Sequence, residues 1–398
     1  MAKIYHADLY GLRKDKYQFL LDHDIQTVEW KEIQPQSPAY FFIPYDQSLE
    51  SEYQDYDSIC DIFGFQSMGI TSGDDGFLYD FSVDELKEKI HQEISKTKII
   101  HSQKTLHKTQ RWIGKIVKKD WKMILYRPFD QRAILYCPHI LARSRPQLNQ
   151  QFNDLNLGLV AIRRSREHHS SNFFVTQLLA DKSILSSADN ANIFPLYIHP
   201  NQSDQQISLI KKSESNLTPT FLKSIEKKFR DQPKPEAIFY YIYAILHSPV
   251  YRQRYGEFLR LDFPRIPFTN NEQLFHDLEQ KGQALVELHL LKSPKLHQLI
   301  TRVGGEGNNA VTEVTYKSQE QRIYINQTRY FEGIKPEVWQ FQIGGYQVLD
   351  KWLKDRKKAK RTLGFDDVLH YQKIVVSLTE TMQLMTEIDQ LMPKFPII

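Results

Sequence analysis

The sequence predicts a mixed α/β protein, in which a mixed-sheet domain is followed by a largely helical region with a small hairpin. In the first half, short runs rich in Ile, Leu, Val and aromatic residues alternate with turn formers, which is typical of strands. After residue 217 the apolar residues recur at helical spacing. Residues 201–216 are polar and low in aromatics, which indicates a linker. We therefore expect domains at 1–200 and 217–398.

The first domain is expected to contain two helices among its strands. Apolar residues share one face of a helix over residues 13–21. Ser82 and Glu85 have the spacing of a capping box at the start of a second helix. Residues 46–60 are polar and acidic and are interpreted as a surface loop. The predicted strands are residues 40–43, 62–70, 133–136, 157–162, 173–175 and 194–197.

The second region alternates helical patterns with proline breaks. Residues 311–316 and 322–326 are expected to pair as a hairpin. The apolar stripe of the last helix is interpreted as core or as a surface for a partner helix. The predicted helices are residues 237–246, 251–261, 272–291, 347–354 and 365–392.

Composition limits the class of protein. No apolar run approaches the length of a membrane span, and the first residues lack the pattern of a signal peptide. The two cysteines, Cys60 and Cys137, lie far apart, which favours a reducing compartment and excludes a cysteine-rich zinc module. We therefore expect a cytoplasmic protein that does not contact a membrane.

Charge changes sign along the chain. Residues 1–100 hold 19 Asp and Glu against 9 Lys and Arg, whereas residues 101–169 hold 4 against 14. Such asymmetry is typical of a surface that meets a polyanion, although a solvated basic face would have the same composition. Because arginines cluster at strand ends in this segment, we interpret it as facing double-stranded DNA.

The arginine clusters supply the candidate contacts. A planar guanidinium group suits both phosphate oxygens and the acceptor edge of guanine. One cluster flanks Ser144, and the other leads from residue 163 into two histidines. The candidate DNA-binding residues are Arg143, Arg145, Arg163, Arg164, Arg166, His168, Lys118 and Lys119.

Other basic or aromatic residues have two interpretations. Arg127 and Arg132 lie near DNA or, as we favour, are structural and held by Asp130 at a turn. Trp112 and Trp121 stack on unpaired bases or, as we favour, anchor their segments to the domain.

In the second region, Arg252 and Arg254 either contact phosphate or pair with Glu257. The basic run 354–361 is expected to be an exposed, solvated loop, with contact to the nucleic-acid backbone as the alternative.

One weak motif suggests metal chemistry. Glu29 and Lys31 form a Glu-x-Lys pair downstream of Asp22 and Asp24, a combination with which some nucleases hold magnesium. The aspartates lie too close in sequence to occupy a separate strand, so we favour an ordinary alternating strand.

Several catalytic motifs are missing from the sequence. It has no P-loop, no H-E-x-x-H and no Cys-x-x-Cys, and the glycines at 304–307 follow no clear strand. It also lacks the Asp-Pro-Pro-Tyr or Asn-Pro-Pro-Tyr box with which amino-methylating enzymes hold a flipped base. Cys137 and His139 are interpreted as structural. We therefore predict no catalytic, cofactor-binding or metal-binding residue in this chain.

Sequence blocks along nearly the whole chain resemble one family. The chain is similar to the C-terminal target-recognition (specificity) region of Type ISP and related single-polypeptide restriction–modification enzymes. The matching blocks are TVEWKEIQPQSPAYFFIP, YRPFDQRAILY, NLGLVAIRRSREHHSSNFFVT, FPLYIHP, FYYIYAILHSPVYRQRYGEFLRLDFPRIPF, LVELHLL, YFEGIKPEVWQFQIGGYQVLDKWLKDRK and HYQKIVVSLTET.

The resemblance implies an adenine-N6 DNA methyltransferase domain upstream, which these residues do not contain. We therefore expect sequence-specific DNA target recognition in a restriction–modification system, with S-adenosylmethionine bound by a methyltransferase partner or an upstream domain. Whether the chain is an enzyme by itself is left open. The alternatives are part of an active DNA adenine methyltransferase and a protein-interaction scaffold that no longer binds DNA.

Overall fold

A computed structural model describes residues 3–9, 13–35, 37, 40, 42, 47–95, 103–152, 156–166, 172–200, 213–392 and 395–397. The chain divides into two compact units, Met1–Asp55 and Tyr56–Ile398. Both units contain helices and strands, which confirms the predicted α/β class. Most of the predicted linker lies outside the described residues, so the domain boundary at 201–216 stays a prediction.

The first unit has one small sheet, in which β1 (Ile4–His6) pairs antiparallel with β2 (Lys31–Ile33). The predicted helix over residues 13–21 is confirmed as α1 (Arg13–Asp22). The predicted acidic loop is wrong in part, because η1 (Gln47–Leu49) and α2 (Glu50–Gln54) lie there. The predicted strand 40–43 falls mostly outside the described residues.

Apolar side chains on the first unit are unusually exposed. Leu21 and Ile25 are 80% and 81% exposed, and a 55-residue unit is too small to bury many such groups by itself. The large apolar residues with exposed side chains in this unit are Tyr5, Tyr17, Leu20, Leu21, Ile25, Trp30, Tyr40 and Phe42.

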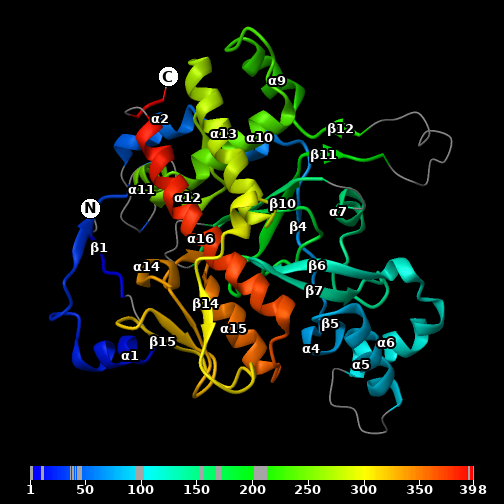
Figure 1. Ribbon diagram of the computed structural model, residues 1–398. Coiled ribbons are helices and arrows are strands. Elements are labelled where there is room, and N and C mark those ends of the chain that lie inside the picture. The colour runs from blue at the N-terminus through cyan, green and yellow to red at the C-terminus, as the bar shows by residue number, and fades with distance from the viewer. Residues whose placement is uncertain are drawn as a thin grey trace. The chain divides into compact units, whose positions relative to one another are not determined.

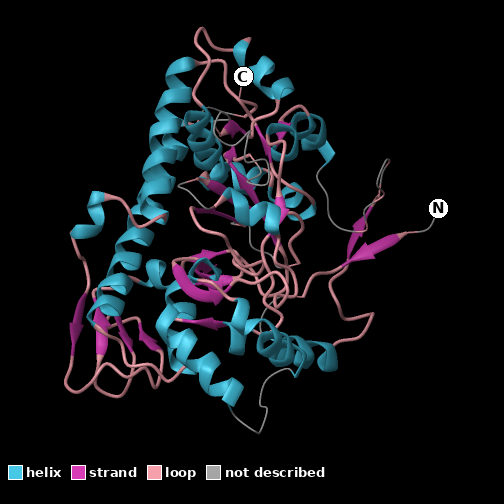
Figure 2. Cartoon of the chain, turned by 90° about the vertical axis from the view of Figure 1, so that its right-hand side faces the viewer, coloured by secondary structure: helices cyan, strands magenta, loops and turns pink. Residues whose placement is uncertain are grey.

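In the described residues of the second unit, the strands form three antiparallel sheets of three or four strands and three two-stranded pairs. Figure 2 shows strands distributed among helices in this unit and not gathered in one large sheet. The first sheet has the order β5 (Tyr79–Asp80), β7 (Asp130–Leu135), β6 (Trp121–Arg127). The second has the order β4 (Ser67–Met68), β10 (Ala191–Pro195), β8 (Gly158–Ile162), β9 (Phe173–Thr176). The third has the order β14 (Arg302–Gly304), β17 (Tyr330–Glu332), β16 (Arg322–Tyr324), β15 (Thr315–Lys317).

Of the two-stranded pairs, one joins segments that are distant in sequence, and two join segments that are close in sequence. They are β3 (Asp57–Ser58) with β13 (Arg265–Ile266), β11 (Tyr197–Ile198) with β12 (Glu214–Ser215), and β18 (Gln342–Ile343) with β19 (Tyr346–Gln347).

Most predicted strands of the second unit are confirmed. The apolar runs at 133–136, 157–162, 173–175 and 194–197 fall on β7, β8, β9 and the β10–β11 segment. The strand predicted over 62–70 is reduced to β4, while Phe63 and Ile70 form isolated bridges to Leu217 and Asp181. Its first residue belongs to the short helix α3 (Ile59–Ile62), at whose start the Ser58 hydroxyl accepts a hydrogen bond from the amide of Cys60. The sequence analysis missed β6, whose lysine interrupts its apolar alternation.

Three long helices form the helical part of the second unit, and Figure 1 shows them close together. They are α10 (Pro235–His247), α13 (Glu272–His289) and α16 (Phe365–Leu391), as predicted. At Gly282 a Cβ atom would lie 1.8 Å from the carbonyl oxygen of Tyr240, so only glycine permits α13 to approach α10 this closely.

The remaining helices that the structure describes have 13 residues or fewer, and α5 is as long as α10. The single helix predicted at 251–261 is broken at Tyr255, whose backbone leaves the helical region, into α11 and α12. The predicted hairpin is confirmed as β15 and β16. The remaining helices are α4 (Asp75–Leu78), α5 (Val83–Ser95), α6 (Gln103–Trp112), η2 (Ile113–Lys115), η3 (Lys118–Asp120), α7 (Pro146–Gln151), α9 (Pro219–Glu226), α11 (Pro249–Arg254), α12 (Gly256–Leu261), η4 (Pro294–His297), α14 (Pro336–Trp339) and α15 (Val348–Lys358).

A buried ion cluster joins the first sheet to α15. The Asp130 carboxylate, 1% exposed, accepts hydrogen bonds from Nε and Nη2 of Arg132 at 3.1 and 2.8 Å. Its other oxygen lies 2.8 Å from Nη2 of Arg356, whose guanidinium packs 3.4 Å from the Trp352 ring centroid. Burial raises the pKa of Asp130, but the two guanidinium groups outweigh burial and hold the pKa below its usual value.

The position of Arg356 corrects one prediction. The basic run 354–361 is not a solvated loop, because its first half continues α15 and Arg356 is buried. Farther along the run, Arg361 pairs with Glu85 at 2.8 Å. The helical spacing of Leu349, Trp352, Leu353 and Arg356 places this arginine on the buried face.

We expect Asp130→Asn to destabilise the protein by about 3–5 kcal/mol, because it leaves two buried guanidinium groups without their carboxylate. The midpoint of urea unfolding at pH 7 measures the change. Asp231→Asn, at an exposed position, is the matched control and should shift the midpoint little. Equal midpoints for the two variants would contradict a stabilising role of the cluster.

Candidate nucleic-acid interface

The second arginine cluster lies on a loop that directly follows β8. Ile162 ends the strand opposite Ala191 of β10, and Arg163 is the next residue. The amide of Ser165 donates a hydrogen bond to the carbonyl oxygen of Arg260 at 3.1 Å, which ties the loop to α12. The backbone of residues 163–166 is thus tied to α12 at Ser165, and the three arginine side chains are exposed.

Two of the three arginines in this loop have carboxylate partners. Nε of Arg163 donates to Oδ1 of Asp262 at 2.9 Å, and both side chains are exposed, at 68% and 60%. The amide of Arg166 donates to Oδ2 of the buried Asp189 at 3.1 Å, and its Nε lies 3.6 Å from Oδ1. Arg164 is exposed and forms no ion pair with any residue that the structure describes.

The first arginine cluster lies on the loop between β7 and α7. The backbone of Arg143 exchanges two hydrogen bonds with Thr71, at 2.9 and 3.0 Å, while its side chain is exposed. Arg145 precedes α7 in a left-handed conformation with φ of 52°. The Tyr136 hydroxyl donates to the carbonyl oxygen of Ser144 at 2.9 Å, which ties the loop between the two arginines to the end of β7.

Lys118 is exposed in η3, close to the start of this loop in space. The carbonyl oxygen of Asp120 accepts a hydrogen bond from the amide of Tyr136 at 2.7 Å, which joins η3 to the end of β7. The backbone of Lys119 belongs to η3, but its side chain and the whole of His168 lie outside the described residues.

Strand register brings the two arginine loops to one end of the second sheet. β10 pairs with β8 on one side and β4 on the other, so β4 and β8 run in the same direction and lie about 10 Å apart. The chain continues from β4 to Thr71, which pairs with Arg143, and from β8 directly to Arg163. The two loops therefore lie at the same end of the sheet.

Arg127, Arg132 and Arg252 are structural, whereas Arg254 is half-buried and its Nε donates to the Tyr255 hydroxyl at 3.3 Å. Arg132 pairs with Asp130 as expected, whereas Arg127 pairs with a different carboxylate, that of Asp181, at 3.2 Å. Arg252 is buried and donates to the carbonyl oxygen of His247 at 3.4 Å, so it does not face phosphate.

The two tryptophans are half-buried. The Trp112 ring stacks on His139 with centroids 3.8 Å apart, and the ammonium group of Lys115 lies 4.7 Å from its centroid. Trp121 begins β6. Both tryptophan rings pack against the hydrophobic core of this unit, which agrees with the anchoring interpretation.

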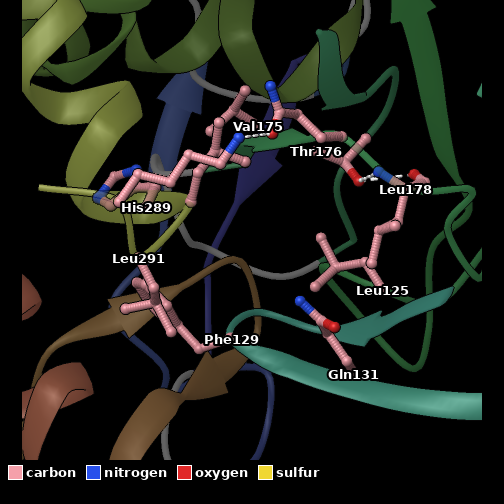
Figure 3. Close-up of a pocket in the computed structure, with 11 residues that line it drawn as sticks. Leu125, Phe129, Gln131, Val175, Thr176, Leu178, His289 and Leu291 are labelled. Atoms are coloured by element: carbon pink, nitrogen blue, oxygen red, sulfur yellow. Dashed lines mark hydrogen bonds between the residues drawn. The ribbon is translucent and has the colours of Figure 1, made fainter. Parts of the chain in front are cut away.

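A cavity of about 280 Å³ lies between the β6–β7 hairpin, the end of β9 and the end of α13. Figure 3 shows Leu125, Phe129 and Leu291 around it, with the amide of Gln131 directed toward the cavity. Thr176 at its rim pairs with Gly158, the first residue of β8, so the cavity lies at the opposite end of the sheet from the arginines. Its residues are Leu125, Phe129, Gln131, Val175, Thr176, Gln177, Leu178, His289, Leu290, Leu291 and Lys292.

His289 beside this cavity is fully engaged in hydrogen bonds. The Thr381 hydroxyl donates to the carbonyl oxygen of Ser377, so it accepts from Nε2 of His289 at 3.0 Å. Nδ1 then accepts from the Tyr243 hydroxyl at 2.5 Å. Burial lowers the pKa of His289 and lowers that of His247 to about 3, so both imidazoles are neutral in the folded state.

The weak magnesium motif receives no support from the geometry. Oδ1 of Asp24 accepts hydrogen bonds from the amides of Gln26 and Thr27, which lowers the pKa of Asp24 and makes it a turn former. In the described part of the chain, no three His, Cys, Asp or Glu side chains are grouped so that they could hold a metal ion. No helix in that part has the length and apolarity needed to cross a membrane.

The sequence analysis missed Asp189 and Asp262, the two carboxylates next to the arginine loop. Asp262 lies 99 positions from Arg163, and no local pattern signals a pair at that separation. The only sequence hint is the position of Asp262 directly after a predicted helix.

Comparison with known proteins gives one family and several similar folds. The sequence profile of the Type ISP C-terminal specificity domain matches residues 61–387. Among solved structures, a nuclease-deletion mutant of the Type ISP restriction-modification enzyme LlaGI in complex with a DNA substrate mimic has a TM-score of 0.70 and 18% identity. That match covers 100% of this chain and 33% of the other. No curated protein matches the chain.

Two further structures have the same fold. A DrdV–DNA complex has a TM-score of 0.73 and 19% identity, over 97% of this chain and 43% of the other. The ATP-dependent Type ISP restriction-modification enzyme LlaBIII bound to DNA has a TM-score of 0.70 and 17% identity, over 93% and 26%. This chain thus spans between about a quarter and two fifths of the length of these proteins.

We expect acid to destabilise the protein through His247 and His289. Their folded pKa values lie below the unfolded value of about 6.5, so the unfolded state binds more protons below that pH, and stability falls as pH falls. Between pH 7.5 and 5.5 the free energy of unfolding should decrease by roughly 1–3 kcal/mol.

Urea unfolding at the two pH values measures this decrease. His247→Gln should reduce the pH dependence, whereas His276→Gln, at an exposed position, should leave it unchanged. An unfolding free energy that is the same at pH 7.5 and 5.5 would show that the two imidazoles are not buried in the neutral form.

Proposed function

The chain belongs to the family of Type ISP C-terminal specificity domains, as its sequence resemblance predicted, and we propose that it recognises a DNA target sequence as the specificity module of a larger restriction–modification enzyme. One observation supports this proposal most directly. Strand register places two exposed arginine loops, around Arg143 and Arg164, at one end of a sheet. Side chains fixed on loops beside a rigid sheet are suited to reach base edges and phosphates. The complexes of LlaGI, DrdV and LlaBIII with DNA add weight to DNA as the ligand.

We further propose that different basic residues make different kinds of contact with DNA. The Arg164 guanidinium, which forms no ion pair with a described residue, is available to form two hydrogen bonds with a guanine edge. Arg143 and Lys118 are also exposed and are suited to phosphate contacts, which fix position and do not read sequence.

We propose that methyl transfer and S-adenosylmethionine binding take place outside these residues, on a methyltransferase partner or domain. The support is the missing nucleotide-binding and base-flipping motifs together with the family resemblance. Because DNA is the proposed ligand, the cytoplasm is the proposed location.

We propose that the exposed apolar side chains of the first unit bind this methyltransferase part. The family match begins at residue 61, so the first unit lies outside the specificity domain proper, while the LlaGI comparison covers it within a chain three times as long. Clustered exposed side chains such as Leu21 and Ile25 are typical of a protein interface.

Leu21→Ser combined with Ile25→Ser should abolish co-purification of the chain with a DNA methyltransferase from its source cells. The matched control is Leu299→Ser with Ile300→Ser, which removes two exposed apolar side chains from the second unit and should leave co-purification intact. Retention of the methyltransferase by the first variant would contradict this docking surface.

Arg164→Ala should weaken binding to the target sequence by about 1–3 kcal/mol, with little effect on other sequences, if Arg164 reads a guanine. Selection from a random duplex pool first identifies the target, and fluorescence anisotropy then measures both affinities. Arg302→Ala is the control, because Arg302 is also exposed but lies on β14 of the third sheet. Unchanged binding to the target would remove Arg164 from the interface.

A further inference from the structure

Two carboxylates contact the arginine loop after β8, and they differ in burial and in the loop atoms that they bind. Asp189 is buried and accepts from the Arg166 amide, while its own amide donates to the Ser186 hydroxyl at 3.1 Å, so it shapes the loop backbone. Asp262 is 60% exposed and, among the loop residues that the structure describes, contacts only the Arg163 guanidinium, at 2.9 Å. Removing the Asp262 charge therefore frees an arginine without removing a backbone contact of the loop.

The Asp262 carboxylate is itself held in place. It directly follows α12, and its Oδ1 accepts from the amide of Phe263 at 2.8 Å. The same segment ties the loop backbone, because the carbonyl oxygen of Arg260 accepts from the Ser165 amide at 3.1 Å. One short segment thus fixes the loop and supplies the charge that pairs with its first arginine.

We propose that Asp262 is a specificity-determining residue, which holds the Arg163 guanidinium away from phosphates when the DNA sequence is not the target. This inference rests on the proposed function. A carboxylate and a phosphate compete for the same planar donors. While Arg163 is paired with Asp262, the protein presents one cation fewer to a random duplex at this end of the sheet.

The physical reason lies in how non-specific binding depends on charge. Affinity for any duplex rises with the number of phosphates that the protein neutralises, and each one steepens the salt dependence by about 0.9. An exposed ion pair of this kind shifts an equilibrium by only about 1.4- to 5-fold, so a well-aligned target contact can still displace Asp262. Weakening non-specific contacts in this way increases the ratio of the affinity for target DNA to the affinity for random DNA.

The test uses the whole chain and a 30-base-pair duplex of random sequence, with fluorescence anisotropy between 50 and 200 mM NaCl. We expect Asp262→Asn to bind the duplex about two- to five-fold more tightly than the natural chain. The slope of log affinity against log salt should become steeper by about 0.9. Arg163→Gln combined with Asp262→Asn should cancel both gains, and Asp262→Glu, which keeps the carboxylate, should cause neither.

Asp61→Asn separates this pairing from a general change of charge. Asp61 is exposed, and its charge acts on Cys60 as that of Asp262 does, but it does not contact Arg163. It should change affinity less than Asp262→Asn and leave the salt slope unaltered.

Equal effects of Asp61→Asn and Asp262→Asn would overturn the inference, and so would unchanged binding by a folded Asp262→Asn variant. In both cases the natural chain still binds DNA, so the proposed function stands. Failure of the natural chain to bind any duplex at 50 mM NaCl would instead overturn the proposed function and the inference together.

Discussion

A buried carboxylate, that of Asp130, lies between two guanidinium groups from distant parts of the chain. Arg132 comes from the same strand and Arg356 from the last part of α15. The Phe81 ring packs against the cluster, with its centroid 3.5 Å from the Arg132 guanidinium carbon and 4.2 Å from that of Arg361. None of these charged groups is stable in the interior without its partners. Their charges are therefore paired only when α15 and the first sheet fold against each other.

Backbone contacts connect this sheet to the loop that carries the first arginine cluster. Leu125 of β6 forms a parallel bridge with Ala180, and the next residue, Asp181, bridges to Ile70. The residue after Ile70 pairs with Arg143. The loop that carries the first arginine cluster is therefore connected to the buried ion cluster by a short series of hydrogen-bonded segments, which limits how far its guanidinium groups can move.

Local patterns predicted the elements that are defined by their own residues. The apolar runs of β7, β8 and β9 are buried throughout or nearly so, and the helical spacing in α10, α13 and α16 reflects their packing against one another. What the sequence did not predict depends on partners distant in sequence. Arg356 looked like part of a solvated run because its carboxylate is on β7. Arg163 looked like a free cation because Asp262 follows a helix in the second half of the chain.

Because β10 pairs with both β4 and β8, one strand holds both the arginine loop after β8 and the segment after β4 whose Thr71 pairs with Arg143. A slip of one residue in either pairing would turn buried side chains outward, so the strands are constrained. Loop length is not, since doubling a loop costs only about 0.6 kcal/mol. Insertions and replacements in the loop beyond Ile162 can therefore accumulate without disturbing the strands, so that the proposed DNA target can change while the framework stays the same.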